Sequence, residues 1–238
     1  MRYAVLSDIH ANWEALEAAL DYLAKQTLHE IWVLGDTLGY GANPNECFEW
    51  MLENADVCLM GNHEKAVIDP KLREDFNPDA CTAVEWTAEV LKPELQLKIQ
   101  KLPYLHITSS STLAHGSPDE PQTFRYLFNF EEARPSFQAF QTPLCFVGHT
   151  HLPSQFIESE ASARRLFPGT SILKKEQRYI LNPGSVGQPR DSDPRLAFGI
   201  FDDEDWKFEM VRLKYDHQKA AAKIRKAGLP PYLADRLL

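Results

Sequence analysis

The chain has 238 residues, an ordinary apolar fraction of 44% and a formal net charge of −9. This length suits one large α/β domain, and the acidic balance disfavours nucleic acid or an anionic membrane as a partner. No apolar run approaches the ~20 residues of a membrane-spanning helix. Only a short apolar run precedes Asp8, so we expect a first strand there, not a signal peptide, and a cytoplasmic protein. The four cysteines form no C-x-x-C pair and are expected to be reduced packing residues.

Strand and helix patterns alternate at the start of the chain. We expect strands at residues 2–8 and 31–34, and a third that reaches Met60. Between the first two strands, apolar residues recur at spacings of three and four, and Asn12 is placed to cap the helix that they predict. Pro44 marks the start of a second helix. Two rounds of strand, helix and strand imply parallel pairing, with helices that cover the sheet.

Residues 65–101 show helical spacing and no strand pattern. Asp79 is a candidate cap for one helix, and Pro93 is the expected start of another. A pair of helices this short has too little core to fold alone. We therefore predict a helical insertion near the mouth of the site, within a single domain that spans residues 1–238.

The chain is rich in strand patterns after Tyr104. A hairpin is expected from residues 105–107 and 111–114, followed by a short helix at 130–140. Further strands are predicted at 155–158, 164–167, 178–181, 196–201 and 207–213. A basic helix at 216–227, ended by Gly228 and part of a helical C-terminal segment at about 216–238, is expected last.

Five apolar runs end in short polar clusters. These clusters are Ser7-Asp8-Ile9-His10, Gly35-Asp36, Gly61-Asn62-His63-Glu64, His115-Gly116 and Gly148-His149-Thr150-His151. Each cluster alone has an ordinary structural explanation, such as a capped turn or a hydrogen-bonded histidine. Five of the eight histidines nevertheless lie in these clusters, and ligands of α/β proteins bind at the carboxyl ends of strands. The combination therefore indicates a functional site.

Seven side chains in these clusters offer oxygen or nitrogen donors and no thiolate. They are Asp8, His10, Asp36, Asn62, His115, His149 and His151. Seven donors are too many for one tetrahedral ion and suit two divalent cations that share a carboxylate. Asp36 is the expected bridge, because it stands alone on its strand. Mn²⁺ is the expected metal, and Fe, Zn²⁺, Ni²⁺ and Mg²⁺ also suit these donors.

The ordered clusters resemble the motifs of the calcineurin-like metallophosphoesterase superfamily over residues 1 to about 200. The segment 182–190 is similar to the small bacterial and archaeal phosphodiesterase branch of that superfamily. The resemblance implies an α/β fold, a four-layer αββα sandwich of two mixed β-sheets flanked by helices. It also implies two groups of metal ligands, namely Asp8, His10, Asp36 and His151 for one ion and Asp36, Asn62, His115 and His149 for the other.

The resemblance further implies that His63 is not a ligand but protonates the leaving oxygen. The superfamily often has an aspartate that orients this histidine, in the motif Gly-Asp-x-x-Asp. This chain has Gly39 at that position, so another part of the chain must orient His63.

We therefore predict a binuclear metal-dependent phosphoesterase with His63 and Asp36 as catalytic residues. A metal-bridging hydroxide would attack phosphorus, and His63 would donate a proton to the departing alkoxide. A small phosphodiester is the first substrate hypothesis, with phosphomonoesters and dinucleoside polyphosphates as alternatives. Arg190 is a candidate for substrate binding, as are Arg125 and Arg195, because arginine presents a planar fork to phosphate.

The sequence is compatible with two rival functions. The first is a non-catalytic scaffold with the same fold, against which His63 argues, because a scaffold needs no proton donor. The second is a nuclease, which the acidic balance disfavours. The sequence leaves the oligomeric state open.

Overall fold

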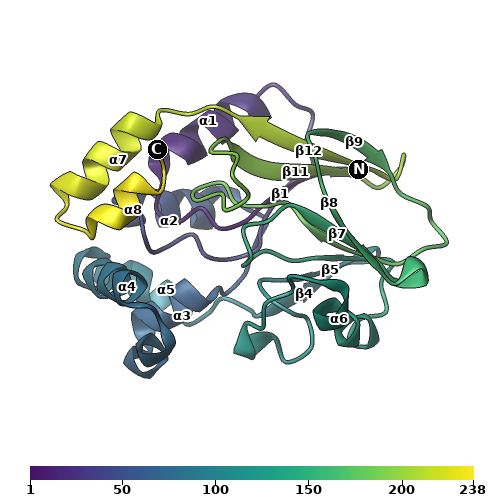
Figure 1. The fold of residues 1–238 in the computed structure, drawn as a ribbon, viewed down its shortest axis with the longest axis horizontal. Helices are drawn as coiled ribbons and strands as arrows, with labels where there is room; N and C mark the ends of the chain where they lie inside the picture. The colour runs from purple at the N-terminus through teal and green to yellow at the C-terminus, as the bar shows by residue number, and fades with distance from the viewer.

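The computed structural model describes residues 1–238, and its strands form two six-stranded sheets (Figure 1). The first sheet contains β1 (Arg2–Leu6), β2 (Glu30–Val33), β3 (Val57–Cys58), β9 (Gly169–Ile172), β11 (Leu196–Asp202) and β12 (Lys207–Leu213). The second contains β4 (Leu105–Ile107), β5 (Ser111–Ala114), β6 (Leu144–Phe146), β7 (Ser154–Ile157), β8 (Ser162–Arg165) and β10 (Tyr179–Asn182). The strand orders are β3-β2-β1-β11-β12-β9 and β4-β5-β6-β10-β7-β8. Both sheets mix parallel and antiparallel pairs, which confirms the predicted fold class.

Side chains of β1 show how the chain fills the space on both faces of the first sheet. Tyr3 and Val5 point between the two sheets and join a core that includes Trp32. Ala4 and Leu6 point the other way and join the core under the helices. Successive side chains of a strand alternate between faces, so a strand buried on both faces is apolar throughout.

Helices cover the outer faces of the two sheets. The helices α1 (Trp13–Leu23) and α2 (Pro44–Asn54) pack on the first sheet through the larger core cluster. The side chain of Asn12 caps α1 by accepting a hydrogen bond from Ala15 N (3.2 Å), as predicted. On the second sheet, α6 (Phe130–Ala133) and the following 3₁₀ turn cover β6 and β10. The helix expected at 130–140 is shorter because Pro135 has no N–H to continue it.

Between β3 and β4, the chain is helical. It forms α3 (Asn62–Ile68), a 3₁₀ turn (Pro70–Asp75), α4 (Pro78–Val90) and α5 (Pro93–Ile99). The predicted cap Asp79 is wrong, since Asn77 accepts the hydrogen bond from Ala80 N (3.0 Å) and Asp79 lies in the first turn. Asn77 precedes Pro78, which occupies the first helical position.

At the C-terminus, the segment expected to be helical at about 216–238 contains two helices, α7 (His217–Lys226) and α8 (Pro231–Asp235). Gly228, with φ +74°, separates them. The edge strand β9 was missed because three of its four residues are exposed and it has no apolar face. None of the helices combines the length and apolarity that crossing a membrane requires.

The parallel strands bring the polar clusters to one place. In the first sheet β1, β2 and β3 run parallel, and in the second β5, β6 and β10 do. The five clusters follow the carboxyl ends of β1, β2, β3, β5 and β6. Because the carboxyl ends of parallel strands share one edge of a sheet, the two sheets present these clusters together.

Candidate metal centre

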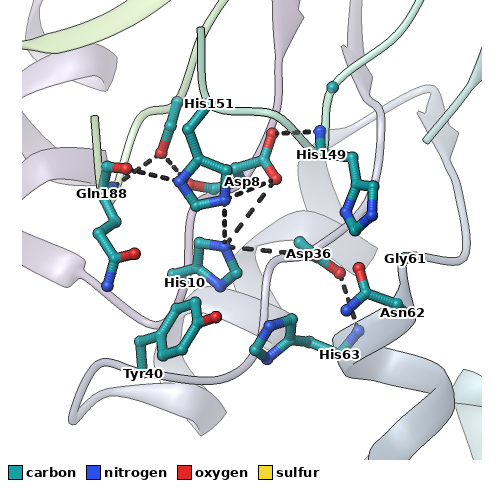
Figure 2. A network of polar contacts seen from close by, with 12 residues as sticks. Asp8, His10, Asp36, Tyr40, Gly61, Asn62, His63, His149, His151 and Gln188 are labelled. Atoms are coloured by element: carbon teal, nitrogen blue, oxygen red, sulfur yellow. Dashed lines mark hydrogen bonds and ion pairs between the residues drawn. The ribbon is translucent and has the colours of Figure 1, made fainter. Parts of the chain in front are cut away.

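Two aspartates lie at the centre of the site, and in each the two carboxylate oxygens have different partners (Figure 2). Asp8 Oδ2 accepts a hydrogen bond from His149 N (3.1 Å), and Asp36 Oδ1 accepts one from His63 N (2.9 Å). The other oxygen of each faces histidine side chains. Asp8 Oδ1 is buried and accepts no hydrogen bond, although His151 Nε2 lies 3.3 Å away. A buried carboxylate oxygen without a donor is costly, and a cation at this place would satisfy it.

Backbone carbonyls orient three of the histidines through Nδ1. The pairs are His10 with Leu38 O (2.9 Å), His115 with Leu34 O (3.1 Å) and His151 with Gln188 O (2.5 Å). A carbonyl oxygen only accepts hydrogen bonds, so Nδ1 carries the proton in each ring and Nε2 of the neutral ring is left with a lone pair. Metal-binding histidines are usually held in this way.

Ring nitrogens of four histidines face one another in pairs. His10 Nε2 lies 3.1 Å from His151 Nε2, and His115 Nε2 lies 3.1 Å from His149 Nδ1. In the pair of His10 and His151, backbone carbonyls hold both Nδ1 protons, so both Nε2 atoms carry lone pairs. Two unprotonated nitrogens at 3.1 Å repel unless a proton or a cation lies with them. The donor atoms of the predicted ligands form two compact groups, Asp8 with His10 and His151, and Asp36 with His115 and His149. A third group joins His10 and Asp36 with His63. The residues present therefore fit divalent cations.

Asp36 lies between the two groups. Its Oδ2 is 3.1 Å from His115 Nε2 and 3.8 Å from His10 Nε2. Asn62 Oδ1 adds a further donor, 3.2 Å from His115 Nε2. The structure thus brings all seven predicted ligands to one place, while their roles as ligands stay a prediction.

Backbone strain is concentrated in the same residues. Five of the seven predicted ligands have positive φ, namely Asp8 (53°), His10 (50°), Asp36 (51°), His149 (67°) and His151 (60°). Such conformations are uncommon outside glycine and cost about 1–3 kcal/mol each. Packing alone gives no reason to accumulate this cost at one edge of the sheets, whereas a ligand-binding site does.

The charges at the site favour cations. Burial disfavours the charged form of Asp8 and Asp36, but the surrounding histidines outweigh it and lower the pKa of both carboxyl groups. Burial lowers the pKa of His10 and His149. Burial also opposes protonation of His115, yet the nearby carboxylates raise its pKa to about 9. Both carboxylates are therefore ionised at neutral pH.

Glu64 has a role that the sequence analysis did not assign. Its buried carboxylate accepts hydrogen bonds from Asp36 N (2.8 Å), Leu38 N (2.8 Å) and Gly61 N (3.0 Å). It therefore fixes the loop that carries Asp36 and does not face His63. Burial raises the pKa of this carboxyl to about 7. The position of a glutamate three residues after Gly61 is typical of a capping box, and that signal predicts such backbone contacts.

Aromatic packing surrounds His63 in place of an orienting carboxylate. Its ring lies 4.5 Å from the ring of Tyr40, 4.7 Å from that of His10 and 5.0 Å from that of Phe76, measured between centroids. Nδ1 of His63 is buried without a hydrogen-bond partner. A Cβ atom added at Gly39 would lie 2.1 Å from this Nδ1. Gly39 therefore leaves the space that the imidazole occupies, and burial lowers the pKa of His63 to about 4.

Gly39→Ala is expected to displace His63 and lower kcat about 10²-fold, because reacting groups tolerate little misplacement. Metal content should stay at the wild-type level, since Gly39 contributes no donor. The matched control is Gly228→Ala, where φ is also positive (+74° against +82°) and the added methyl group meets no atom within 4 Å. Equal losses of kcat in both variants would show that backbone strain, and not contact with His63, is the cause.

Arg190 lines the cavity over the metal centre, together with His63 and Tyr40. Its Nη2 donates to Gln188 Oε1 (3.0 Å) and to the Tyr40 hydroxyl (3.3 Å). The other two candidate arginines lie outside this cavity and are paired with aspartates, Arg125 with Asp119 and Arg195 with Asp193. Of the three, only Arg190 is placed to meet a substrate at the site.

Two mixed sheets with oxygen and nitrogen donors gathered at the strand ends define an α/β fold with a candidate metal centre. The chain belongs to the calcineurin-like phosphoesterase superfamily, because the model of that superfamily domain matches residues 1–205. Members of this family generally bind divalent metals. Membership indicates that the chain is a hydrolase that acts on ester bonds.

Three relatives illustrate the similarity. An uncharacterized protein of Methanocaldococcus jannaschii is 39% identical over 241 residues, which cover 98% of this chain and 96% of that protein. The crystal structure of a metallophosphoesterase from Sphaerobacter thermophilus is 40% identical, with a TM-score of 0.90 over 100% of this chain and 98% of that one. A hypothetical protein of Pyrococcus horikoshii shares the fold at 18% identity, with a TM-score of 0.80 over 99% and 97% of the chains.

Proposed function

We propose that the protein is a binuclear metal-dependent phosphoesterase whose preferred substrate is a small phosphodiester. The observation that carries the proposal is the paired donor set, in which unprotonated ring nitrogens face one another 3.1 Å apart beside a buried carboxylate oxygen without a donor. One ion would be held by Asp8, His10, Asp36 and His151. The other would be held by Asp36, Asn62, His115 and His149.

Two bound divalent cations would supply a hydroxide nucleophile at neutral pH and neutralise charge on the phosphoryl oxygens. Mn²⁺ is the proposed metal. Asp36 is the proposed bridging ligand, because its Oδ2 faces both groups of donors. Glu64 keeps Asp36 in place through three hydrogen bonds to the backbone.

His63 is the proposed proton donor to the leaving oxygen. It lines the cavity but adds no hydrogen bond to the donor cage through its side chain. The negative charge of a bound phosphoester favours the protonated imidazole, which opposes the effect of burial on its pKa. Arg190 is placed to bind a phosphoryl oxygen, because its guanidinium lies at the same cavity and is held by Tyr40 and Gln188.

Phosphomonoesters and dinucleoside polyphosphates remain the alternative substrates, because the same donors would bind a phosphoryl group of either. The alternative of a non-catalytic scaffold predicts bound metal without hydrolysis. His63 and its space beside Gly39 favour the enzyme, since metal binding alone requires neither.

Metal removal tests the proposed function. The protein is treated with a chelator, refilled with Mn²⁺ and assayed on bis(p-nitrophenyl) phosphate, p-nitrophenyl phosphate and single-stranded DNA. We expect hydrolysis only after refilling, with the small diester as the best substrate, because the catalytic hydroxide requires the ions. Activity that survives complete removal of metal would contradict the proposal, and a refilled protein that hydrolyses no ester would favour the scaffold.

A further inference from the structure

A second cavity of about 480 Å³ adjoins the cavity over the metal centre, and Arg190 lines both. We call this cavity the arm subsite. Its lining includes Phe128, Leu152, Pro153, Arg164, Arg165 and Arg190. Leu152 directly follows the predicted ligand His151, so the arm subsite begins where the donor cage ends.

Aromatic rings lead from the metal centre into the arm subsite. The ring of Tyr126 stacks on that of His149, with centroids 3.7 Å apart and an interplanar angle of 13°. Phe128 stacks on Tyr126 in turn, at 5.1 Å and 15°. Phe128 is 53% exposed, so an aromatic face beside the centre is open to a ligand. Such a face stacks on heterocyclic bases with about 1–3 kcal/mol per base.

The charge of the arm subsite is opposite to that of the whole chain. Three arginines line it against one acidic residue, Asp191, whereas the formal net charge of the protein is −9. Arg164 is paired with Glu160, which lies outside this lining. The Asp191 side chain is only 5% exposed and is already paired with Arg165 and Arg212. The guanidinium of Arg190 donates to neutral groups, namely Gln188 Oε1 and the Tyr40 hydroxyl. The surface that a ligand meets here is therefore cationic and suits an anionic group.

The sizes of the two cavities indicate an extended substrate. The cavity over the metal centre measures about 230 Å³, which is below the usual range of about 300–1,000 Å³ for small-molecule sites. It is large enough for a phosphoryl group but leaves little room for both of its ester substituents. One substituent must extend beyond it, and the arm subsite is the adjoining space.

We propose that the arm subsite binds a nucleotide substituent of the phosphodiester, with its base stacked on Phe128 and a second phosphate held by Arg165, while Arg190 lies between the two cavities. The proposal rests on the proposed function for the scissile ester and specifies its substrate class. The remainder of the substrate, with the scissile phosphorus, lies over the metal centre.

Three substrates with the same leaving group, assayed in the presence of Mn²⁺, test this subsite. They are methyl p-nitrophenyl phosphate, thymidine 5′-(p-nitrophenyl phosphate) and thymidine 3′-phosphate 5′-(p-nitrophenyl phosphate). We expect kcat/KM of the wild type to rise along this series. Phe128→Ala should reduce the gain from methyl to thymidine about 10-fold, and Arg165→Gln should reduce the gain from the added phosphate about 10-fold. A flat series in the wild type would overturn the subsite.

Matched controls come from α7 and α8, at residues that line neither cavity. Tyr232→Ala removes an aromatic side chain of similar exposure (54% against 53%). Arg225→Gln removes an arginine whose ion pair with Asp235 (2.7 Å) resembles that of Arg165 with Asp191 (2.8 Å). Both controls should keep the selectivity series of the wild type. Equal changes in the controls and in the subsite variants would also overturn the subsite.

Binding of thymidine 3′,5′-bisphosphate, measured by calorimetry, separates the subsite from the proposed function. We expect this probe to bind the wild type at least about 10-fold more tightly than inorganic phosphate, with the gain lost in Phe128→Ala and in Arg165→Gln. If it binds in this way while no ester is hydrolysed, the subsite stands and the proposed catalysis fails. If esters are hydrolysed while the probe binds no better than inorganic phosphate, the subsite fails and the catalysis stands.

Discussion

His63→Ala is expected to lower kcat about 10²–10⁴-fold on alkyl phosphodiesters while both metal ions stay bound. The reason is that general acid catalysis contributes this much, and that the His63 side chain shares no hydrogen bond with the donor cage. The loss should be smallest on nitrophenyl esters, because nitrophenolate leaves without a proton. Rates on matched alkyl and nitrophenyl diesters, with metal analysis of the same samples, make the measurement.

The control for this variant is His106→Ala, because His106 lies on β4, outside the cavity over the metal centre. It should keep both activity and metal. A His63→Ala protein that has lost its metal would show that His63 is a ligand. An equal loss on both kinds of ester would show that His63 is not the proton donor.

Asp36→Asn is expected to weaken the binding of both ions together. Asp36 Oδ2 faces both groups of donors, and the substitution removes the negative charge that they share. Loss of a residue that is hydrogen-bonded to a metal ligand lowers metal affinity about 10–100-fold. Loss of a bridging ligand should therefore lower the affinity for each ion at least about 10-fold. Activity at limiting Mn²⁺ should fall with the metal content.

Metal titration of the variant measures the two affinities separately. Asp119→Asn is the matched control, because this carboxylate is paired with Arg125 and belongs neither to the candidate metal groups nor to the lining of the cavity over them. It should bind metal as the wild type does. If Asp36→Asn loses one ion and keeps the other at wild-type affinity, Asp36 is not a bridge.

The position of the site was predictable because each cluster follows an apolar run. A polar residue at the end of a buried strand has few structural reasons to be there, and the parallel order of the strands brings such ends together. The resemblance of the ordered motifs predicted the two-sheet sandwich, which the strand orders confirm. Local spacing alone would not have paired the two sheets, because their contacts are distant in sequence.

Other features depend on tertiary contacts that the sequence does not reveal. Arg125, Arg190 and Arg195 look equivalent as candidates in the sequence, but only Arg190 lies at the cavity over the metal centre. The sequence shows that no aspartate stands at position 39 to orient His63. It does not show that the rings of Tyr40 and Phe76 pack on His63 instead. The arm subsite escaped prediction for the same reason, because segments distant in sequence line it.

Anomalous diffraction from crystals soaked in Mn²⁺ tests the central claim most directly, namely that seven side chains hold two ions at the ends of the strands. We predict two strong peaks about 3.5–4 Å apart, one on each side of Asp36 and both within reach of the histidine nitrogens that now face one another. Crystals in which Asp8, Asp36 and His149 keep their places with no peak between them would contradict the metal centre and the phosphoesterase chemistry proposed for it.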